Sequence, residues 1–340
     1  MRAAIAKPSN KKKIIISVLI ALFLIIGVGI GYAAYLYNKT DSIVSDAHED
    51  VGRDNETSQL RMGNVDPVED NVSVLFIGVD DSEHREVENS RSDALLLATF
   101  NQEQSTVKLL SIPRDTYVYV PEVNYATKIN HAHSFGGPRA TIETIEEFLD
   151  VPVDYYVRMN FNAFVDVVDA LDGIWLNVPY EILESDSDDK RDSIHLYPGY
   201  QQLDGEQALA LARTRKYDND VERGKRQQEI LTEIANKATS ASSLFKLEDV
   251  IVAVGTNLRT NLTFGEIRSF LSYGLDEGIQ IENVNFSGQG GYMEAGGWFY
   301  QVDEESRIQI QTELRNHLEL EPLGESIEYA EPDDNLYQPE

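Results

Sequence analysis

The 340-residue sequence contains no cysteine, so disulfide bonds and thiol chemistry are excluded. It also has few cations, with 29 Lys and Arg against 58 Asp and Glu and a formal net charge of −29. Residues 1–13 hold five cations and no acid, so the remainder has 24 cations against 58 acids, a charge of −34. A surface of this sign repels phosphate backbones, so nucleic acid is not expected as a partner.

Long hydrophobic runs are scarce as well, and one stands out. Residues 14–37 (IIISVLIALFLIIGVGIGYAAYLY) carry no charge and are long enough to cross a bilayer. The cations before them predict a cytoplasmic N-terminus (1–13) and an extracellular remainder, in a single-pass protein of the cell membrane. A cleaved signal peptide is the alternative, although its apolar core would normally span about 7–15 residues.

The exported part divides by composition. Residues 38–70 are polar and acidic, which predicts a flexible stalk. Residues 71–320 contain enough apolar sequence for one large domain, and the acidic residues 321–340 predict a disordered tail.

Short apolar runs alternate with helical patterns in the domain. Strands are predicted at 72–79, 94–100, 106–113, 151–159 and 173–179, and helices at 136–150, 161–171 and from 204 onward. The loop between 100 and 106 has hairpin length, so the strands that it joins are expected to be antiparallel. The alternation predicts a layered α/β domain with a mixed sheet, in which 241–273 adds helices and 287–303 a long connection.

Charged residues cluster at the ends of the first three strands. If neighbouring strands are antiparallel, one edge of the sheet gathers Asp80, Asp81, Arg91, Asp93 and Arg114. Weak surface ion pairs are the alternative interpretation.

The stretch 208–230 concentrates cations in this acidic chain. One helix face runs from Asp220 and Arg223 through Gln227 to Ile230 and Ile234, so an apolar stripe becomes charged at its N-terminal end. Lys225 lies on the opposite side of this helix and is expected to face solvent. Arg213 and Arg215 precede the helix in the chain. Guanidinium groups suit phosphate oxygens, and neighbouring carboxylates suit Mg²⁺. The pattern predicts a metal-assisted diphosphate site.

Four segments together carry a family resemblance: RSDALLLATF, SIPRDTYVYVP, KINHAHSFGG and ARTRKYDNDVERGKRQQ. Residues 72–237 resemble the LytR-CpsA-Psr family of cell-wall ligases. The resemblance implies a three-layer α/β/α fold whose mixed sheet encloses an apolar polyprenyl pocket. It also implies transfer of a glycopolymer from undecaprenyl diphosphate to the C6 hydroxyl of N-acetylmuramic acid in peptidoglycan, in a Gram-positive bacterium.

The same resemblance assigns roles to residues. It implies Asp80 and Asp93 as ligands of Mg²⁺ or Mn²⁺, with Asp81 as an alternative to Asp80. The implied catalytic residues are Asp93, Arg114, Arg213, Arg215 and Arg223. The implied substrate-binding residues are Arg91, Lys128, Asp220, Arg226 and Gln227. A receptor for polyprenyl diphosphates would need the arginines without the carboxylates, whereas a diphosphatase would use the same site with water.

Overall fold

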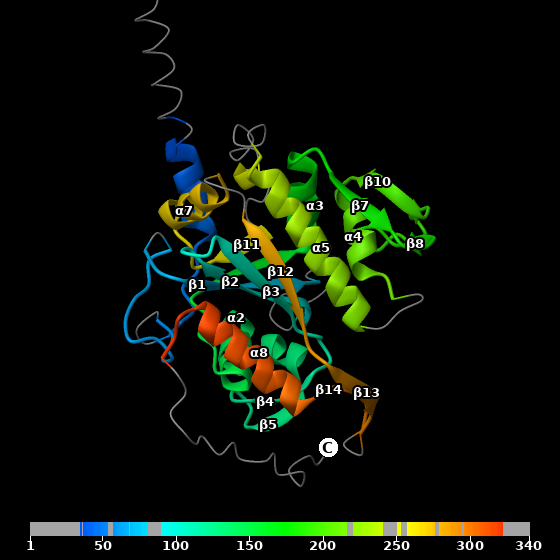
Figure 1. Ribbon diagram of the computed structural model, residues 1–340. Coiled ribbons are helices and arrows are strands. Elements are labelled where there is room, and N and C mark those ends of the chain that lie inside the picture. The colour runs from blue at the N-terminus through cyan, green and yellow to red at the C-terminus, as the bar shows by residue number, and fades with distance from the viewer. Residues whose placement is uncertain are drawn as a thin grey trace, which may run out of the picture.

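A six-stranded mixed sheet forms the centre of the computed structural model (Figure 1). The strand order is β11-β6-β1-β2-β3-β12; β1–β2, β2–β3 and β6–β11 are antiparallel, whereas β1–β6 and β3–β12 are parallel. These strands are β1 (Val72–Val79), β2 (Ser92–Asn101), β3 (Thr106–Ser111), β6 (Tyr155–Asn160), β11 (Leu258–Thr260) and β12 (Gln280–Asn285). The predicted first three strands, and the antiparallel pairing of the second and third, are confirmed.

The structure describes residues 35, 37–53, 57–67, 69–80, 90–215, 220–240, 250–252, 257–275, 279–293 and 296–321. Within these ranges the longer helices are α2 (Ile129–Leu149), α3 (Phe161–Ala170), α4 (Gly205–Arg213), α5 (Asp220–Ala238), α7 (Phe264–Leu275) and α8 (Glu304–His317). Small two-stranded sheets are formed by β4 (Tyr117–Val120) with β5 (Tyr125–Lys128), β7 (Ile174–Val178) with β10 (Gly199–Leu203), β8 (Ile182–Glu184) with β9 (Ile194–Leu196), and β13 (Gly288–Tyr292) with β14 (Trp298–Val302).

Helices cover both faces of the central sheet. On one face, Leu75, Ile77 and Leu97 pack with Ile145 of α2 and Leu314 of α8. On the other face, strand residues pack with α5 through Leu231 and with α7 through Phe270. Figure 1 shows α2 and α8 below the sheet and α5 and α7 above it. The expected layering of helix, mixed sheet and helix is therefore present.

Three predictions about local structure are wrong or need correction. The predicted strand at 173–179 is a strand, β7, but it pairs with β10 outside the central sheet. The region 241–273 contributes α7 as expected, but also the strand β11 at the sheet edge. The region 287–303 is the β13–β14 hairpin rather than a long connection.

Two contacts bring α5 close to the sheet. A Cβ at Gly224 would lie 2.2 Å from Ser111 Oγ, so only glycine allows this approach. The buried Gln228 amide donates to the carbonyl oxygens of Leu109 (2.7 Å) and Val284 (2.9 Å), on β3 and β12. The N-terminal half of α5 is thereby fixed beside the ends of these strands.

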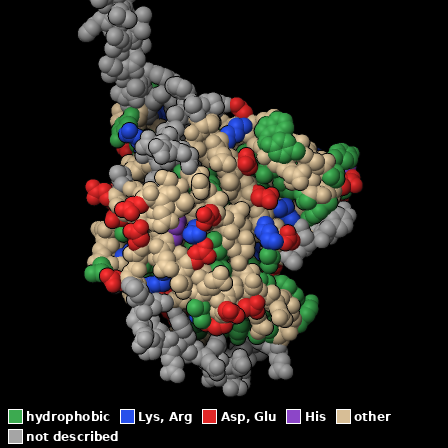
Figure 2. Space-filling view, viewed as in Figure 1, with side chains coloured by type: hydrophobic (Ala, Val, Ile, Leu, Met, Phe, Trp, Pro, Cys, Tyr) green, Lys and Arg blue, Asp and Glu red, His purple; other side chains and the backbone are tan. Residues whose placement is uncertain are grey.

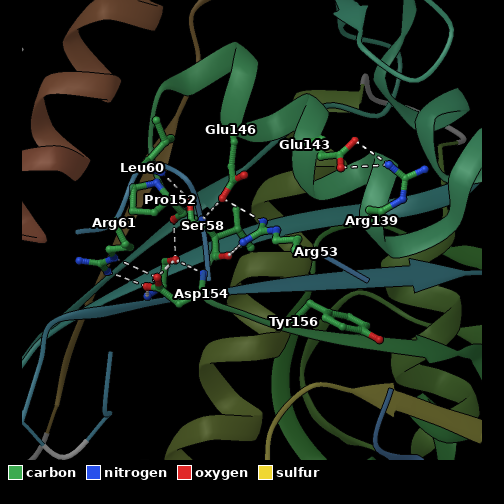
Figure 3. A network of polar contacts seen from close by, with 12 residues as sticks. Arg53, Ser58, Leu60, Arg61, Arg139, Glu143, Glu146, Pro152, Asp154 and Tyr156 are labelled. Carbon is green, nitrogen blue, oxygen red and sulfur yellow. Dashed lines mark hydrogen bonds and ion pairs between the residues drawn. The ribbon is translucent and has the colours of Figure 1, made fainter. Parts of the chain in front are cut away.

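The predicted flexible stalk is wrong for the described residues between 37 and 67. Residues 37–47 are helical, and Val44, Ala47 and Val51 are buried. Figure 3 shows how the chain that follows is held by ion pairs. Arg53 lies 3.0 Å from Glu146, and Arg61 lies 2.6 Å from Asp154; all four side chains are largely buried. This polar segment packs through buried charge pairs, which its composition does not reveal.

The predicted membrane span lies outside the described residues, apart from Tyr35 and Tyr37, and so does the tail after Glu321. In the part of the chain that the structure describes, no helix is both long and apolar enough to cross a membrane.

Candidate active site

A cavity of about 440 Å³ lies between the sheet and helices α3, α4 and α5. Side chains from β1, β2 and β6 form its floor, and the three helices form its walls. Its interior is apolar, lined by Phe76, Leu96, Met159, Phe161, Phe164, Val167, Leu209, Ile230, Leu231 and Ile234. A cavity of this size and lining suits part of a hydrocarbon chain.

Charged side chains also line the cavity. We call this group the charged mouth: Asp80, Asp93, Arg114, Arg213, Arg215 and Arg223. Arg114, Arg215 and Asp93 are close enough to Arg223 for their charges to act on it. The cavity therefore combines an apolar interior with four guanidinium groups and three carboxylates, since Glu184 lines it as well.

The sheet places three of these groups through its strand ends. Asp80 follows β1 directly, and Asp93 lies at the start of β2, beside the register shift at Gly78/Val79. Arg114 follows β3 and forms an ion pair with Asp93. The predicted gathering at one sheet edge thus holds for Asp80, Asp93 and Arg114. The alternative ligand Asp81 lies outside the described residues.

Helix α5 brings its predicted face to the cavity. Arg223, Gln227, Ile230 and Ile234 all line it, in the order charged, polar and apolar. Asp220 does not line it; its carboxylate lies 3.0 Å from the Arg223 guanidinium and 3.8 Å from that of Arg215. Asp220 is therefore placed to orient the arginines rather than to contact a ligand.

The Arg223 guanidinium is buried, an environment that disfavours its charged form. The residue is 4% exposed, and its Nε has no hydrogen-bond partner. Burial lowers the pKa of the Arg223 guanidinium to about 10, with Asp220 acting in the opposite direction and Arg215 and Arg114 reinforcing the decrease. A buried cation with an unused donor at a cavity wall is suited to receive an anion.

Arg213 closes the last turn of α4 and lies over an aromatic ring. Its guanidinium carbon is 4.5 Å from the centre of the Phe161 ring, and its NH1 donates to the carbonyl oxygen of Asp186 (3.3 Å). A capping box of Asp204 and Gln207 starts the helix that presents it, at the predicted position. Arg215, two residues later, is the most exposed of the four arginines, with 42% of its side chain accessible.

Besides Asp220, three more of the predicted substrate-binding residues do not line the cavity. Arg226 is buried and donates to the carbonyl oxygens of Leu211 (3.1 Å) and Thr214 (2.6 Å), so it holds the end of α4 in place. The Lys128 ammonium lies 2.9 Å from Asp115. Lys128 and the exposed Arg91 lie near His131, whose pKa is lowered to about 4 by burial and then by these two charges.

The donor set at the mouth suits one divalent cation. Among the described residues, no cluster of three or more His, Cys, Asp and Glu side chains could hold a metal alone. Asp80 and Asp93 both line the cavity, and Mg²⁺ commonly uses one or two carboxylates together with phosphate oxygens. The residues therefore fit Mg²⁺ that arrives with, or binds together with, a phosphate ligand.

Sequence reasoning missed two polar lining residues, Asn160 and Glu184. Asn160 caps α3 by accepting from Ala163 N (2.9 Å), a signal that the N-cap pattern could have given. Glu184 belongs to the short strand β8, and nothing in its local sequence marks it.

Comparisons with known proteins show the family of this chain. The LytR_cpsA_psr family model matches residues 34–316. The chain is 38% identical over 299 residues to TagT of Bacillus subtilis, a polyisoprenyl-teichoic acid–peptidoglycan teichoic acid transferase, covering 87% of this chain and 91% of TagT. A structure of TagT bound to LI-WTA is 35% identical, with a TM-score of 0.69, and the match covers 80% of this chain and 100% of that one. A TagT structure with bound octaprenyl pyrophosphate lipid is 33% identical, with a TM-score of 0.65 and the same coverage.

Proposed function

The chain belongs to the LytR-CpsA-Psr family, and we propose that it is a membrane-anchored phosphotransferase of the bacterial cell wall. It transfers an anionic glycopolymer from undecaprenyl diphosphate to the C6 hydroxyl of N-acetylmuramic acid in peptidoglycan. The observation that carries this proposal is one cavity that joins an apolar interior to four arginines and to the aspartates Asp80 and Asp93. A polyprenyl diphosphate has the same division between hydrocarbon and charge.

The apolar interior binds the isoprenoid chain. Each CH₂ group moved out of water contributes about 0.8 kcal/mol, so several isoprene units give substantial affinity. Phe164, Leu231 and Ile234 lie on facing helices, so the tail is enclosed between α3 and α5.

The charged mouth binds the diphosphate. Guanidinium forks pair with phosphate oxygens in charge-assisted hydrogen bonds, and Arg223 offers a donor without a partner. Asp80 and Asp93 would hold Mg²⁺, which neutralises phosphate charge when bound. Asp220 and Gln228 act indirectly, since the first pairs with Arg223 and the second fixes α5 to the sheet.

The transfer needs no external energy source, because the phosphoanhydride bond of the donor is broken as the new phosphodiester bond forms. The acceptor oxygen forms a bond to the phosphorus that carries the glycopolymer, and the phosphoanhydride bond to the lipid phosphate breaks. Undecaprenyl phosphate leaves with the bonding electron pair, and the hydroxyl proton passes to solvent. Phosphoryl transfer requires mainly positioning and charge neutralisation, which the arginines of this site are placed to supply.

Residues 14–37 anchor the enzyme in the membrane that contains its lipid donor. Their charge asymmetry places the domain outside the cytoplasm. Relatives named as teichoic acid transferases occur in several Bacillus species, which supports a Gram-positive cell surface.

The decisive experiment incubates the full-length protein with a labelled polyprenyl-diphosphate glycan and peptidoglycan oligomers, with and without Mg²⁺. We expect label on peptidoglycan and release of polyprenyl phosphate only when Mg²⁺ is present. Release of free glycan phosphate into water would instead indicate a diphosphatase. Tight lipid binding with no covalent change would indicate a receptor.

A further inference from the structure

The outer face of the β7–β10 sheet exposes a stacked aromatic pair. The rings of Trp175 and Tyr200 lie 5.5 Å apart at an interplanar angle of 29°. Trp175 is 46% exposed and Tyr200 is 71% exposed, whereas Ile174 and Leu203 on the inner face are buried. Figure 2 shows hydrophobic side chains gathered over these strands, at the upper right of the molecule. Large aromatic rings held in place at the surface mark a binding surface.

Amide side chains complete this face. In the strand register, Gln202 lies opposite Trp175 and Asn177 lies opposite Tyr200. The two rings therefore occupy one diagonal of the face and the two amides the other. Tyr197, 63% exposed, precedes Tyr200 by three residues and lies against His195 at 4.4 Å. We call the set of Trp175, Asn177, Tyr197, Tyr200 and Gln202 the aromatic platform.

The chain around the platform is acidic. Residues 180–206 contain eight Asp and Glu against two Lys and Arg. This charge repels anionic phospholipid headgroups and anionic glycopolymers alike. The glycan backbone of peptidoglycan carries one carboxylate per disaccharide, the lactyl group of N-acetylmuramic acid, so it is repelled less than a polymer with a phosphate on every unit. The C–H faces of this glycan pack on aromatic rings, and its hydroxyl and acetamido groups hydrogen-bond to amides.

The platform is continuous with the charged mouth through the neighbouring hairpin. Glu184 at the end of β8 lines the cavity, and Asp186 accepts a hydrogen bond from Arg213. The inner face of β7–β10 packs in one cluster with Ile230 and Ile234 of α5. The platform itself does not line the cavity, so a ligand on it would lie outside the donor site.

We propose that the aromatic platform binds the glycan backbone of the peptidoglycan acceptor strand. This inference rests on the proposed function, because it takes the acceptor from that reaction. A strand bound along the outside of β7–β10 is held near the mouth, where one of its hydroxyl groups can meet the lipid-bound donor. The platform acts by positioning and takes no part in bond making.

The chain contains two tryptophans, Trp175 and Trp298, so a Trp298→Phe background leaves Trp175 as the reporter. Full-length protein in neutral detergent is titrated with glycan strands freed of teichoic acid and stem peptides. We expect a saturable change in Trp175 emission, and Tyr200→Ala should weaken glycan binding at least tenfold. The matched control is Tyr292→Ala, because Tyr292 is 85% exposed on another hairpin, and it should bind as well as the parent.

Two further measurements make the outcome decisive. Tyr200→Ala should retain octaprenyl diphosphate binding and the thermal midpoint, and should raise the KM for peptidoglycan with little change in kcat. Glycan binding that is unchanged by Tyr200→Ala would overturn the platform. So would a Trp175 response to phosphatidylcholine vesicles but not to glycan, or a self-association that Tyr200→Ala abolishes. Because glycan binding is measured without lipid donor, loss of transfer alone would refute the proposed function and leave the platform standing.

Discussion

Replacing Arg223 by alanine tests the charged mouth most directly. The residue is 4% exposed, lines the cavity and has an unpartnered Nε. Its pKa is lowered to about 10 by burial, so its charge disfavours the folded state at neutral pH. A bound diphosphate would compensate for that lost hydration. We therefore expect Arg223→Ala to impair ligand binding and transfer while leaving the unliganded fold nearly as stable as before.

The magnitude follows from the contacts that are lost. A hydrogen bond to a charged group is worth about 1.5–3 kcal/mol, and about 1.4 kcal/mol corresponds to a tenfold change. One lost phosphate contact should therefore reduce kcat/KM by about 10- to 150-fold. Stability should change little, since Asp220 loses its 3.0 Å partner but keeps Arg215 at 3.8 Å. The thermal midpoint should shift by no more than about 3 °C, which corresponds to about 1 kcal/mol in a domain of this size.

Two neighbours on α5 provide matched controls with the same change in charge. Lys225 is exposed, its ammonium lies 2.7 Å from Glu222, and Lys225→Ala should leave both transfer and stability unchanged. Arg226 is buried and holds two carbonyl oxygens at the end of α4. Arg226→Ala should lower the free energy of unfolding by about 3–6 kcal/mol, since each of the two bonds contributes about 1.5–3 kcal/mol.

The assay measures transfer of labelled glycopolymer to peptidoglycan, together with the thermal shift produced by octaprenyl diphosphate. Parent protein should be stabilised by the lipid, and Arg223→Ala should lose most of that stabilisation. Equal effects of Arg223→Ala and Lys225→Ala on transfer at one salt concentration would show a diffuse basic patch and refute the positioned mouth. A large drop in midpoint for Arg223→Ala without ligand would refute the interpretation of its burial.

Three other substitutions test, in turn, the proposed metal ligand, a buried ion pair and the protonation of a buried histidine. Asp93→Asn should abolish Mg²⁺-dependent transfer while the protein still copurifies with polyprenyl phosphate by mass spectrometry; undiminished transfer would remove Asp93 from the site. Arg61→Ala should lower the free energy of unfolding by about 3–5 kcal/mol in urea titrations, because it removes the cation that pairs with the buried Asp154 carboxylate and leaves that carboxylate with its hydrogen bonds from Ser73; an unchanged midpoint would contradict the docked N-terminal segment. The pKa of His317 is lowered to about 4, first by burial and then by Lys108, so its neutral form stabilises the fold above pH 6.5 and that contribution is lost as pH falls toward 4. His317→Gln should therefore show a shallower loss of stability between pH 6.5 and 4, and a slope equal to that of the parent would exclude this protonation.

The parts of the site that follow a local period could be predicted from sequence. The α5 face is an example, because residues spaced by three and four necessarily share one side of a helix. Asp80, Asp93 and Arg114 were also found, since strand ends fix their position as soon as the antiparallel order is known. Arg226 was misassigned because it lies on the same charged turn; only the chain path after α4 shows that its guanidinium faces Leu211 and Thr214.

Features that depend on long-range pairing could not be predicted from the sequence. Strand β11 has three residues, too few for a period, and exists because it pairs with β6. The Gly-rich run 288–291 predicts a loop, yet it forms the strand β13. The Trp298 ring packs against Gly290, where a side chain would clash with it. The packing of the polar segment before β1 could not be predicted either. Arg53 pairs with Glu146, and Arg61 pairs with Asp154, each about 93 residues further along the chain.

That docked segment changes how the proposed anchor works. A flexible stalk of residues 38–70 would have an average end-to-end distance of about 30 Å, leaving the domain free to rotate above the bilayer. Instead, the Tyr37 ring, at the end of the proposed span, contacts the Phe264 ring of α7 at 5.3 Å, and Val44 and Ala47 of the same helix are buried. In the described residues, the helix that follows the proposed span therefore packs on the domain that holds the cavity. Each CH₂ group withdrawn from the bilayer costs about 0.8 kcal/mol unless an apolar wall replaces the lipid. If residues 14–37 anchor the domain at the membrane as proposed, the domain needs to withdraw only the part of an isoprenoid that its own cavity covers, so a short cavity suffices for a long lipid.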